Sequence, residues 1–111
     1  MIYIFFLFNL DKPQPPRNLS FVDISFNRAN LSWIPGFDGG KAQSFYVNVL
    51  NEEGAIIRTF KVDEETQKDA TIYLTLTQLH PDTSYDVEVV ATNSFGTSNS
   101  SLKLTTVGKL F

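Results

Sequence analysis

The sequence predicts an all-β fold, a seven-stranded antiparallel Greek-key β-sandwich, on three observations. Apolar and polar side chains alternate along the stretch from Leu76 to Ala91, which is typical of a half-buried strand. Tyr85 follows a turn at Pro81 and Asp82, the place of a tyrosine corner, whose phenol hydroxyl bonds to upstream backbone. Turn signals recur about every 8–12 residues and helix signals are absent, as a sandwich requires.

Each expected strand is bounded by residues that turn or interrupt the chain. In chain order, the strands are expected at about 18–25, 29–34, 44–50, 56–62, 72–76, 85–91 and 102–104. Prolines at 13, 15 and 16 stiffen the extended segment before the first strand and remove backbone donors there, which discourages edge-to-edge pairing. Pro35 ends the second strand because it fixes φ and lacks an N–H. Residues 51–54 form the turn between the third and fourth strands.

The same alternation predicts which side chains form the core. The inward positions carry aliphatic or aromatic side chains, and burying each one contributes about 1.5–3 kcal/mol. Val90 is the residue that breaks the alternation in its strand. The expected core consists of Leu19, Leu31, Trp33, Phe45, Val47, Val49, Leu76, Leu79, Tyr85, Val87, Val89, Ala91, Leu102 and Leu104, with Phe21, Ile24, Ile72 and Leu74 as further candidates.

The order and spacing of these motifs resemble one known family. The stretch LTQLHPDTSYDVEVVATNSFGTS at 76–98 resembles the last strands of a fibronectin type III domain, and PPRNL at 15–19 and LSWIPG at 31–36 resemble its first two strands. The resemblance covers about residues 13–107 and implies an immunoglobulin-like sandwich of fibronectin type III topology. An immunoglobulin domain would carry a cysteine two residues after Tyr85, where this chain has Val87.

Composition limits the kinds of function that the chain can have. With 111 residues it is one domain, large enough to bury a core without disulfides or metals. A net charge of -3 argues against nucleic acid or an anionic membrane as the main partner. The absence of cysteine excludes disulfides, thiolate metal sites and cysteine nucleophiles.

The domain is expected at 13–107, between an apolar leader or truncated start at 1–12 and a tail or linker at 108–111. The apolar run at 1–10 is too short to span a bilayer as a helix, which takes roughly 20 apolar residues. It also lacks the basic region and the small residues of a complete signal peptide. We therefore expect the start of a fragment of a larger protein, and an extra strand or a packing arm is the alternative.

No constellation of residues predicts catalysis, a cofactor or a metal site. His80 is the only histidine and lies in a Leu-His-Pro turn, so neither a zinc site nor a Ser-His-Asp triad has support. The carboxylates of Asp63, Glu64, Glu65 and Asp69 lack the spacing and the glycine of a calcium loop, and a solvated loop explains them. We expect neither an enzyme nor a small-molecule substrate.

Two loop phenylalanines are candidates for a contact with another domain or a partner. Phe37 lies in the loop at 36–40 and Phe95 in the loop at 93–98, and the strand order places both loops at the same end of the sandwich as the N-terminus. The pair either caps the core locally or contacts a preceding domain or a ligand, since exposed apolar clusters usually mark contacts.

Three N-x-S sequons are candidates for N-glycosylation in a secreted domain. They begin at Asn18, Asn30 and Asn99, all of which are expected on outward faces or edges. Unused sequons are the alternative, because a chain rich in Asn, Ser and Thr contains some by chance.

These observations favour a non-catalytic module of a multidomain adhesion or receptor protein, at the cell surface or secreted. It would act as a spacer and as a protein-binding surface, through the Phe37 and Phe95 end and through the face of the strands at 44–50, 56–62, 85–91 and 102–104. Its partners would be proteins: neighbouring domains, or an adhesion or receptor partner, a second copy included. We expect no nucleic acid as a partner, and contact with a membrane only through other parts of the parent chain.

Two alternatives remain open at the level of the sequence. The PGFDGG loop at 35–40 resembles loops of type III domains in immunoglobulin-superfamily adhesion receptors, but a similar DGG loop occurs in the intracellular type III domains of giant muscle proteins. The first alternative is therefore a cytoplasmic structural module of a giant muscle or cytoskeletal protein. The second is an accessory domain attached to a receptor enzyme.

Overall fold

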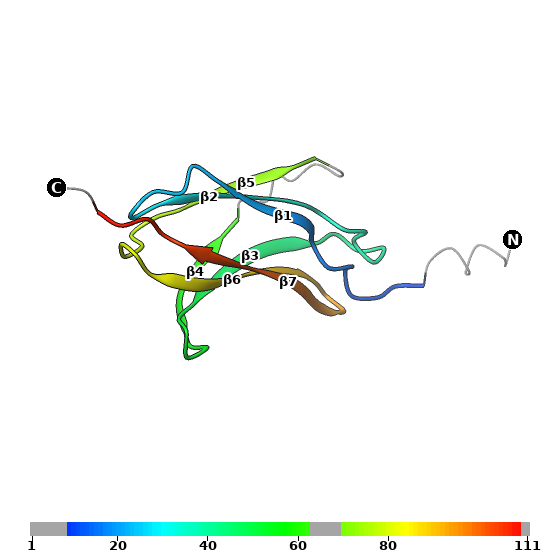
Figure 1. Ribbon diagram of the computed structural model, residues 1–111. Helices are drawn as coiled ribbons and strands as arrows, with labels where there is room; N and C mark the ends of the chain where they lie inside the picture. Colours follow the sequence, from blue (N-terminus) through cyan, green and yellow to red (C-terminus); the bar gives the residue numbers. More distant parts are fainter. Residues whose placement is uncertain (1–8, 63–69, 110–111) are drawn as a thin grey trace, which may run out of the picture.

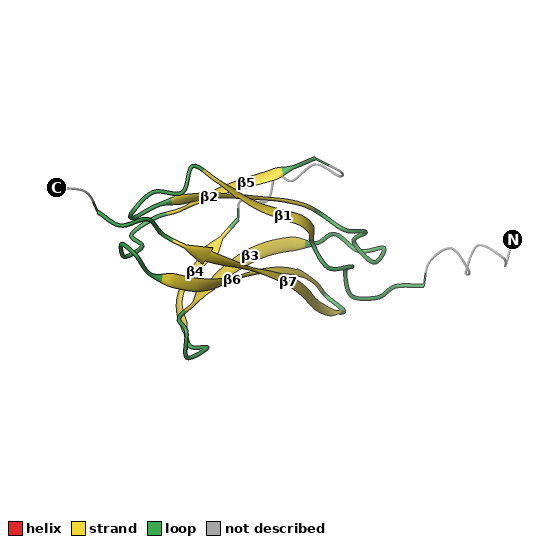
Figure 2. Cartoon of the chain, in the orientation of Figure 1, coloured by secondary structure: helices red, strands yellow, loops and turns green. Residues whose placement is uncertain are grey.

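The computed structural model describes residues 9–62 and 70–109, and within these ranges the chain forms seven β-strands. They are β1 (Arg17–Val22), β2 (Ala29–Ile34), β3 (Ser44–Leu50), β4 (Ile56–Lys61), β5 (Ile72–Leu76), β6 (Ser84–Asn93) and β7 (Gly96–Thr105). They make two antiparallel sheets packed face to face (Figure 1, Figure 2), so the predicted all-β sandwich is confirmed. Among the described residues, no helix is long and apolar enough to cross a membrane.

The chain moves between the two sheets in a Greek-key order. One sheet has the strand order β1-β2-β5 and the other has the order β4-β3-β6-β7. The crossings lie in the β2–β3, β4–β5 and β5–β6 connections. The β6–β7 hairpin pairs from Ser84 with Thr105 to Asn93 with Gly96, and β7 also contacts β1 of the other sheet.

The core lies between the sheets and receives side chains from both. Trp33 of β2 packs against Phe45 of β3 with ring centroids 5.8 Å apart and a tilt of 59°, a favourable arrangement for two aromatic rings. Of the side chains expected in the core, those that are buried are Leu31, Trp33, Phe45, Val47, Val49, Ile72, Leu76, Leu79, Tyr85, Val87, Val89, Ala91 and Leu104. Ala29 joins the same cluster, and Phe21 and Leu74 pack against it while partly buried.

Burial departs from simple alternation at the sheet edges and at one central position. Leu19 on the edge strand β1 and Leu102 on the edge strand β7 are only partly buried, whereas Leu104, also on β7, is buried. Val90 shows the opposite behaviour. It lies on the outer face of β6, yet it is 4% exposed, because β6 is an inner strand and Val90 is flanked by Tyr46 on β3 and Asn99 on β7.

The first strand is shorter than the sequence predicts. It ends at Val22 rather than at Ser25, because Asp23 adopts a φ of 54° and the N–H of Ser25 donates to the carbonyl of Arg28 in a turn (2.8 Å). Ile24 is therefore exposed instead of buried. The fourth strand ends at residue 61, one residue before the expected position.

Candidate partner-contact site

The β2–β3 loop and the β6–β7 turn lie at the end of the sandwich where the chain enters (Figure 1), and each carries one of the two loop phenylalanines. Phe37 belongs to the β2–β3 loop and Phe95 to the β6–β7 turn, and they are 62% and 51% exposed. At these exposures the side chains contribute little to the core. These exposures argue against capping of the core, and contact with another domain or a partner stays a prediction.

One side chain, Asn93 at the end of β6, joins three segments at this end of the molecule. Its Nδ2 donates to the carbonyl of Asp11 (2.8 Å) and to the carbonyl of Asp38 (2.9 Å). Its Oδ1 accepts the N–H of Phe95 (2.8 Å), which closes the β6–β7 turn. The amide of Asn93 thus bonds to the chain before β1, to the β2–β3 loop and to its own turn.

Residues 10–16, called the leading segment below, lie along the two loops and make backbone hydrogen bonds to one of them. The N–H of Asp11 donates to the carbonyl of Gly39 (3.0 Å), and the N–H of Gln14 donates to the carbonyl of Phe37 (2.8 Å). Asp11 is therefore hydrogen-bonded to the sandwich, and the domain boundary expected at residue 13 stays a prediction. Residues 1–8 of the expected leader lie outside the described residues.

Two serines of β7 hold the other side of the leading segment. The hydroxyl of Ser98 donates to the carbonyl of Pro13 (2.5 Å), and the hydroxyl of Ser100 donates to the carbonyl of Pro16 (2.5 Å). Proline carbonyls remain available as acceptors although the residue has no N–H of its own. The proline run is consequently tied to the edge strand β7 by side chains rather than by a backbone ladder.

Three glycines let the leading segment approach the loops closely. A Cβ at Gly36 would lie 2.8 Å from the carbonyl oxygen of Pro15, and one at Gly39 would overlap the carbonyl oxygen of Asp11. A Cβ at Gly96 would lie 3.2 Å from the Cβ of Lys12. Glycines in these loops are therefore explained by contact with the chain's own N-terminal side.

The outer face of the four-stranded sheet, the second surface expected to bind proteins, is polar. Near its centre, the Nδ2 of Asn48 donates to Glu88 Oε1 (3.0 Å), and the hydroxyl of Thr59 donates to Asn48 Oδ1 (2.7 Å). This network joins β3, β4 and β6. A protein bound there would have to form hydrogen bonds with these polar groups.

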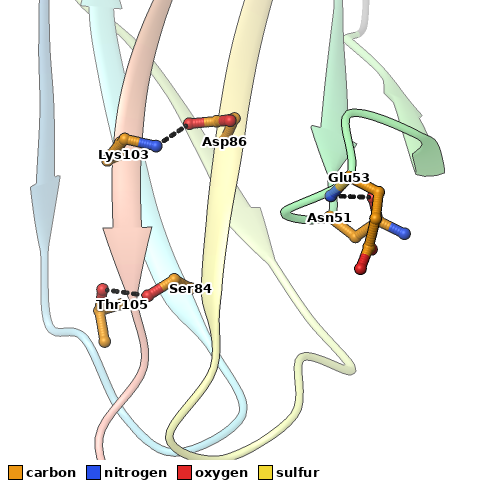
Figure 3. A network of polar contacts seen from close by, with 6 residues as sticks. All are labelled: Asn51, Glu53, Ser84, Asp86, Lys103 and Thr105. Carbon is orange, nitrogen blue, oxygen red and sulfur yellow. Dashed lines mark hydrogen bonds and ion pairs between the residues drawn. The ribbon is translucent and has the colours of Figure 1, made fainter.

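The same face continues along the β6–β7 hairpin (Figure 3). Lys103 Nζ lies 2.9 Å from Asp86 Oδ1, and the hydroxyls of Ser84 and Thr105 are 2.9 Å apart. The hydrogen bond to Asp86 and the charge of its carboxylate raise the pKa of the Lys103 amine above its ordinary value. Because the Lys103 side chain is 83% exposed, this pair contributes little to stability.

The remaining residues with potential chemistry have structural explanations. The N–H of His80 donates to Tyr85 Oη (2.8 Å), which is the bond to upstream backbone that the tyrosine corner predicts. The side chain of His80 is exposed. Within the part of the chain that the structure describes, no group of three or more His, Cys, Asp or Glu side chains is placed to hold a metal. The loop with Asp63, Glu64, Glu65 and Asp69 lies outside the described residues.

The three sequon asparagines differ in their surroundings. Asn18 on β1 and Asn99 on β7 are exposed on edge strands. Asn30 on the central strand β2 is half-buried, and both atoms of its amide are engaged: Nδ2 donates to Asp23 (3.3 Å) and Oδ1 accepts from Thr75 (2.8 Å). Asn18 and Asn99 are therefore better placed than Asn30 to carry a glycan.

The role of Asn93 is the feature of this site that the sequence did not predict. Strand alternation marks it only as the end of β6, and its partners lie 82 and 55 residues away in the chain. The glycines at 36, 39 and 96 were the available signal, because a loop glycine indicates either a positive φ, as at Gly39 and Gly96, or a close backbone approach, as at Gly36.

Comparison with known proteins identifies one domain family and finds similar sequences in both cell-adhesion proteins and a muscle protein. A family model described as "Fibronectin type III domain" matches residues 14–107. Nephrin of Mus musculus is 35% identical over 94 residues, which are 83% of this chain and 7% of Nephrin. The cell adhesion molecule Dscam1 of Drosophila melanogaster is 28% identical over 95 residues, 86% of this chain and 5% of that protein. The fast-type myosin-binding protein C of Gallus gallus is 31% identical over 94 residues, 84% of this chain and 8% of that protein.

Solved structures show the same sandwich. A crystal structure of titin domains superimposes with a TM-score of 0.64 at 27% identity and covers 87% of this chain and 33% of that one. A computationally redesigned β-sandwich superimposes with a TM-score of 0.69 at 26% identity, covering 86% of this chain and 96% of that one. The chain spans about 7% of the length of Nephrin, so similarity at this level concerns one domain of a much longer relative.

Proposed function

The chain belongs to the fibronectin type III family, and from this membership we propose that it is a non-catalytic spacer and protein-contact domain of a cell-surface adhesion or receptor protein. Similarity to Nephrin and to the cell adhesion molecule Dscam1 supports this context. The proposed partners are proteins: the neighbouring domains of the same chain, and an adhesion or receptor partner on another cell or on the same cell. Binding to a second copy of the same protein is one form of that contact.

The observation that carries the proposal is the exposed pair Phe37 and Phe95 at the end where the chain enters the sandwich. The loop of Phe37 is hydrogen-bonded to the leading segment, and the side chain of Asn93 bonds both to that segment and to the N–H of Phe95. The first and last described residues lie at opposite ends of the molecule (Figure 1), so further domains on either side would follow in line. A preceding domain would then face both phenylalanines, and its contact would remove their side chains from water.

A second candidate is a structural module of an intracellular muscle or cytoskeletal protein. The similarity to myosin-binding protein C and to titin domains favours it. The domain would still be a spacer that contacts its neighbours through the same end, but the protein would carry no N-linked glycans. The two candidate functions therefore differ in the cellular compartment of the protein. They do not differ in the residues that contact the neighbouring domain.

The double change Phe37→Ser with Phe95→Ser tests the contact. Because both side chains are largely exposed, we expect the melting temperature of the isolated domain to fall by less than about 4 °C. A photoreactive phenylalanine analogue placed at position 37 of the parent protein in cells should crosslink to a neighbouring domain or to a partner protein, in a peptide that mass spectrometry identifies.

The matched control is the same analogue at Tyr73, which is 72% exposed on the edge strand β5. The proposed contact would be contradicted if the analogue at position 37 crosslinked no more often, and to no more specific a partner, than the analogue at position 73. A large loss of stability in the double serine variant would show instead that the two phenylalanines belong to the core.

A further inference from the structure

The leading segment has no strand partner of its own, yet it is held in place. The first strand starts at Arg17, so the backbone groups of residues 10–16 lie outside both sheets. Buried or half-buried backbone groups need partners, and here the loops, Asn93 and two serines of β7 supply them. The end of the molecule where the chain enters is thus built from segments that are far apart in sequence.

The side chain of Asn93 has two roles that can be separated chemically. Its Oδ1 accepts the N–H of Phe95 and closes the β6–β7 turn, a role that any Asx side chain can fill. Its Nδ2 donates to the carbonyls of Asp11 and Asp38, which an ionised carboxylate cannot do because it has no hydrogen to donate. The second role ties the leading segment to the β2–β3 loop, because one NH₂ group bridges two carbonyl oxygens.

The glycines provide a second, independent part of the same arrangement. Gly39 lies so close to Asp11 that a Cβ there would overlap its carbonyl oxygen, and the φ of Gly39 is 77°. Gly54, in the β3–β4 turn, has a similar φ of 85° but no atom within 4 Å of a Cβ position. Comparing the two glycines therefore separates the contact with the leading segment from backbone strain.

We propose that Asn93 is a positioning residue that, with the glycine-lined loops, locks the leading segment against the sandwich and so fixes the direction in which the chain enters the domain. The lock would make the joint to a preceding domain rigid and hold Phe37 and Phe95 at a set angle to that domain. This consequence for a preceding domain rests on the proposed function. The lock itself is a property of the chain alone and is tested without any partner.

Asn93→Asp in the full chain tests the lock. The carboxylate still accepts the N–H of Phe95, but it has no hydrogen to donate to Asp11 and Asp38. We expect amide hydrogen exchange at Asp11, measured by NMR, to accelerate by about tenfold or more, while exchange at Phe95 stays as in the native chain. The backbone order parameter of Asp11 should fall from about 0.85 toward 0.6. Ser94→Ala, an exposed change in the same turn, is the control and should alter neither residue.

A second pair of variants tests the lock without touching Asn93. Gly39→Ala should accelerate exchange at Asp11 and Gln14, whereas Gly54→Ala, with comparable backbone strain, should leave both unchanged. Native exchange at Asp11 in Asn93→Asp, or the same exchange in Gly39→Ala as in Gly54→Ala, would overturn the proposal. Since these measurements use the isolated chain, a rigid leading segment combined with no crosslinking at position 37 would refute the proposed contact and leave the lock standing.

Discussion

At the scale of single residues, the buried phenol of Tyr85 joins the turn before β6 to the strand itself. The N–H of His80 donates to its hydroxyl, and that is the bond that fixes the connection as it leaves β5. Tyr85→Phe removes the acceptor but keeps the ring, so a part-buried N–H loses its partner. We expect a loss of about 1–2 kcal/mol in the free energy of unfolding, measured by urea denaturation.

Tyr73 offers a matched control for this change, because the same hydroxyl is deleted from a side chain that is 72% exposed. Tyr73→Phe should change the free energy of unfolding by less than about 0.5 kcal/mol. Equal effects of the two changes would show that the Tyr85 hydroxyl makes no net contribution and that the ring alone maintains the turn.

At the scale of elements, the outer face of β6 contains a buried apolar position. Val90 is 4% exposed between Tyr46 and Asn99 of the neighbouring strands. Val90→Thr keeps the shape of the side chain and places a hydroxyl in the same space, which should cost about 1–2 kcal/mol in the free energy of unfolding. The same substitution at Val22, which is 49% exposed on the edge strand β1, should cost less than about 0.5 kcal/mol. If both changes cost the same, Val90 is solvated and the outer face of β6 is polar throughout.

The elements that the sequence predicts well are those whose pattern is local. Alternation and turn residues place β2 and β3 at their observed ends and identify Trp33 and Phe45 as core residues. The partial burial of Leu19 and Leu102 was not predicted, because it depends on how the two sheets meet, and that is set by contacts between distant segments. A period of two says which side chains share a face. It does not say how many neighbours cover that face.

In the candidate site, too, the sequence predicts the features that depend on local pattern and misses those that depend on contacts between distant segments. The strand order is enough to bring Phe37 and Phe95 to the N-terminal end of the sandwich, and the structure finds both exposed there. The bonds from Asn93 to Asp11 and Asp38 depend on the path of residues 10–16 over the loops, and no local pattern encodes that path. The sequence therefore predicts which loops meet, but not which side chain holds them together.

At the scale of the whole molecule, the two better-placed sequons lie along one edge of the sandwich. Asn18 is on β1 and Asn99 on β7, and these strands contact each other; Ser100 of β7 also donates to the carbonyl of Pro16, just before β1. Glycans at both positions would cover this edge and leave the opposite edge strand, β4, free for proteins. Glycosylation would therefore also determine which surface of the domain is accessible to a partner.

We expect the domain, secreted from cultured cells behind an added signal peptide, to lose mass on treatment with N-glycosidase. Ser20→Ala and Ser101→Ala abolish the sequons of Asn18 and Asn99 without changing either asparagine, and each should remove one glycan. This choice matters at Asn18, whose φ of 56° favours asparagine over most residues. Ser32→Ala, which abolishes the sequon of the engaged Asn30, should leave the mass loss unchanged.

The same enzyme applied to the parent protein from native tissue decides between the two proposed contexts. A parent protein much larger than this chain that loses mass on digestion places the domain in a secreted or cell-surface protein, because N-glycans are added only in the secretory pathway. A very large parent that loses no mass, although the secreted domain accepts glycans at Asn18 and Asn99, would contradict the adhesion or receptor context. In that outcome the similarity to myosin-binding protein C and titin would identify the better model for its surroundings. The lock at Asn93 would still hold, since it depends only on residues within the domain.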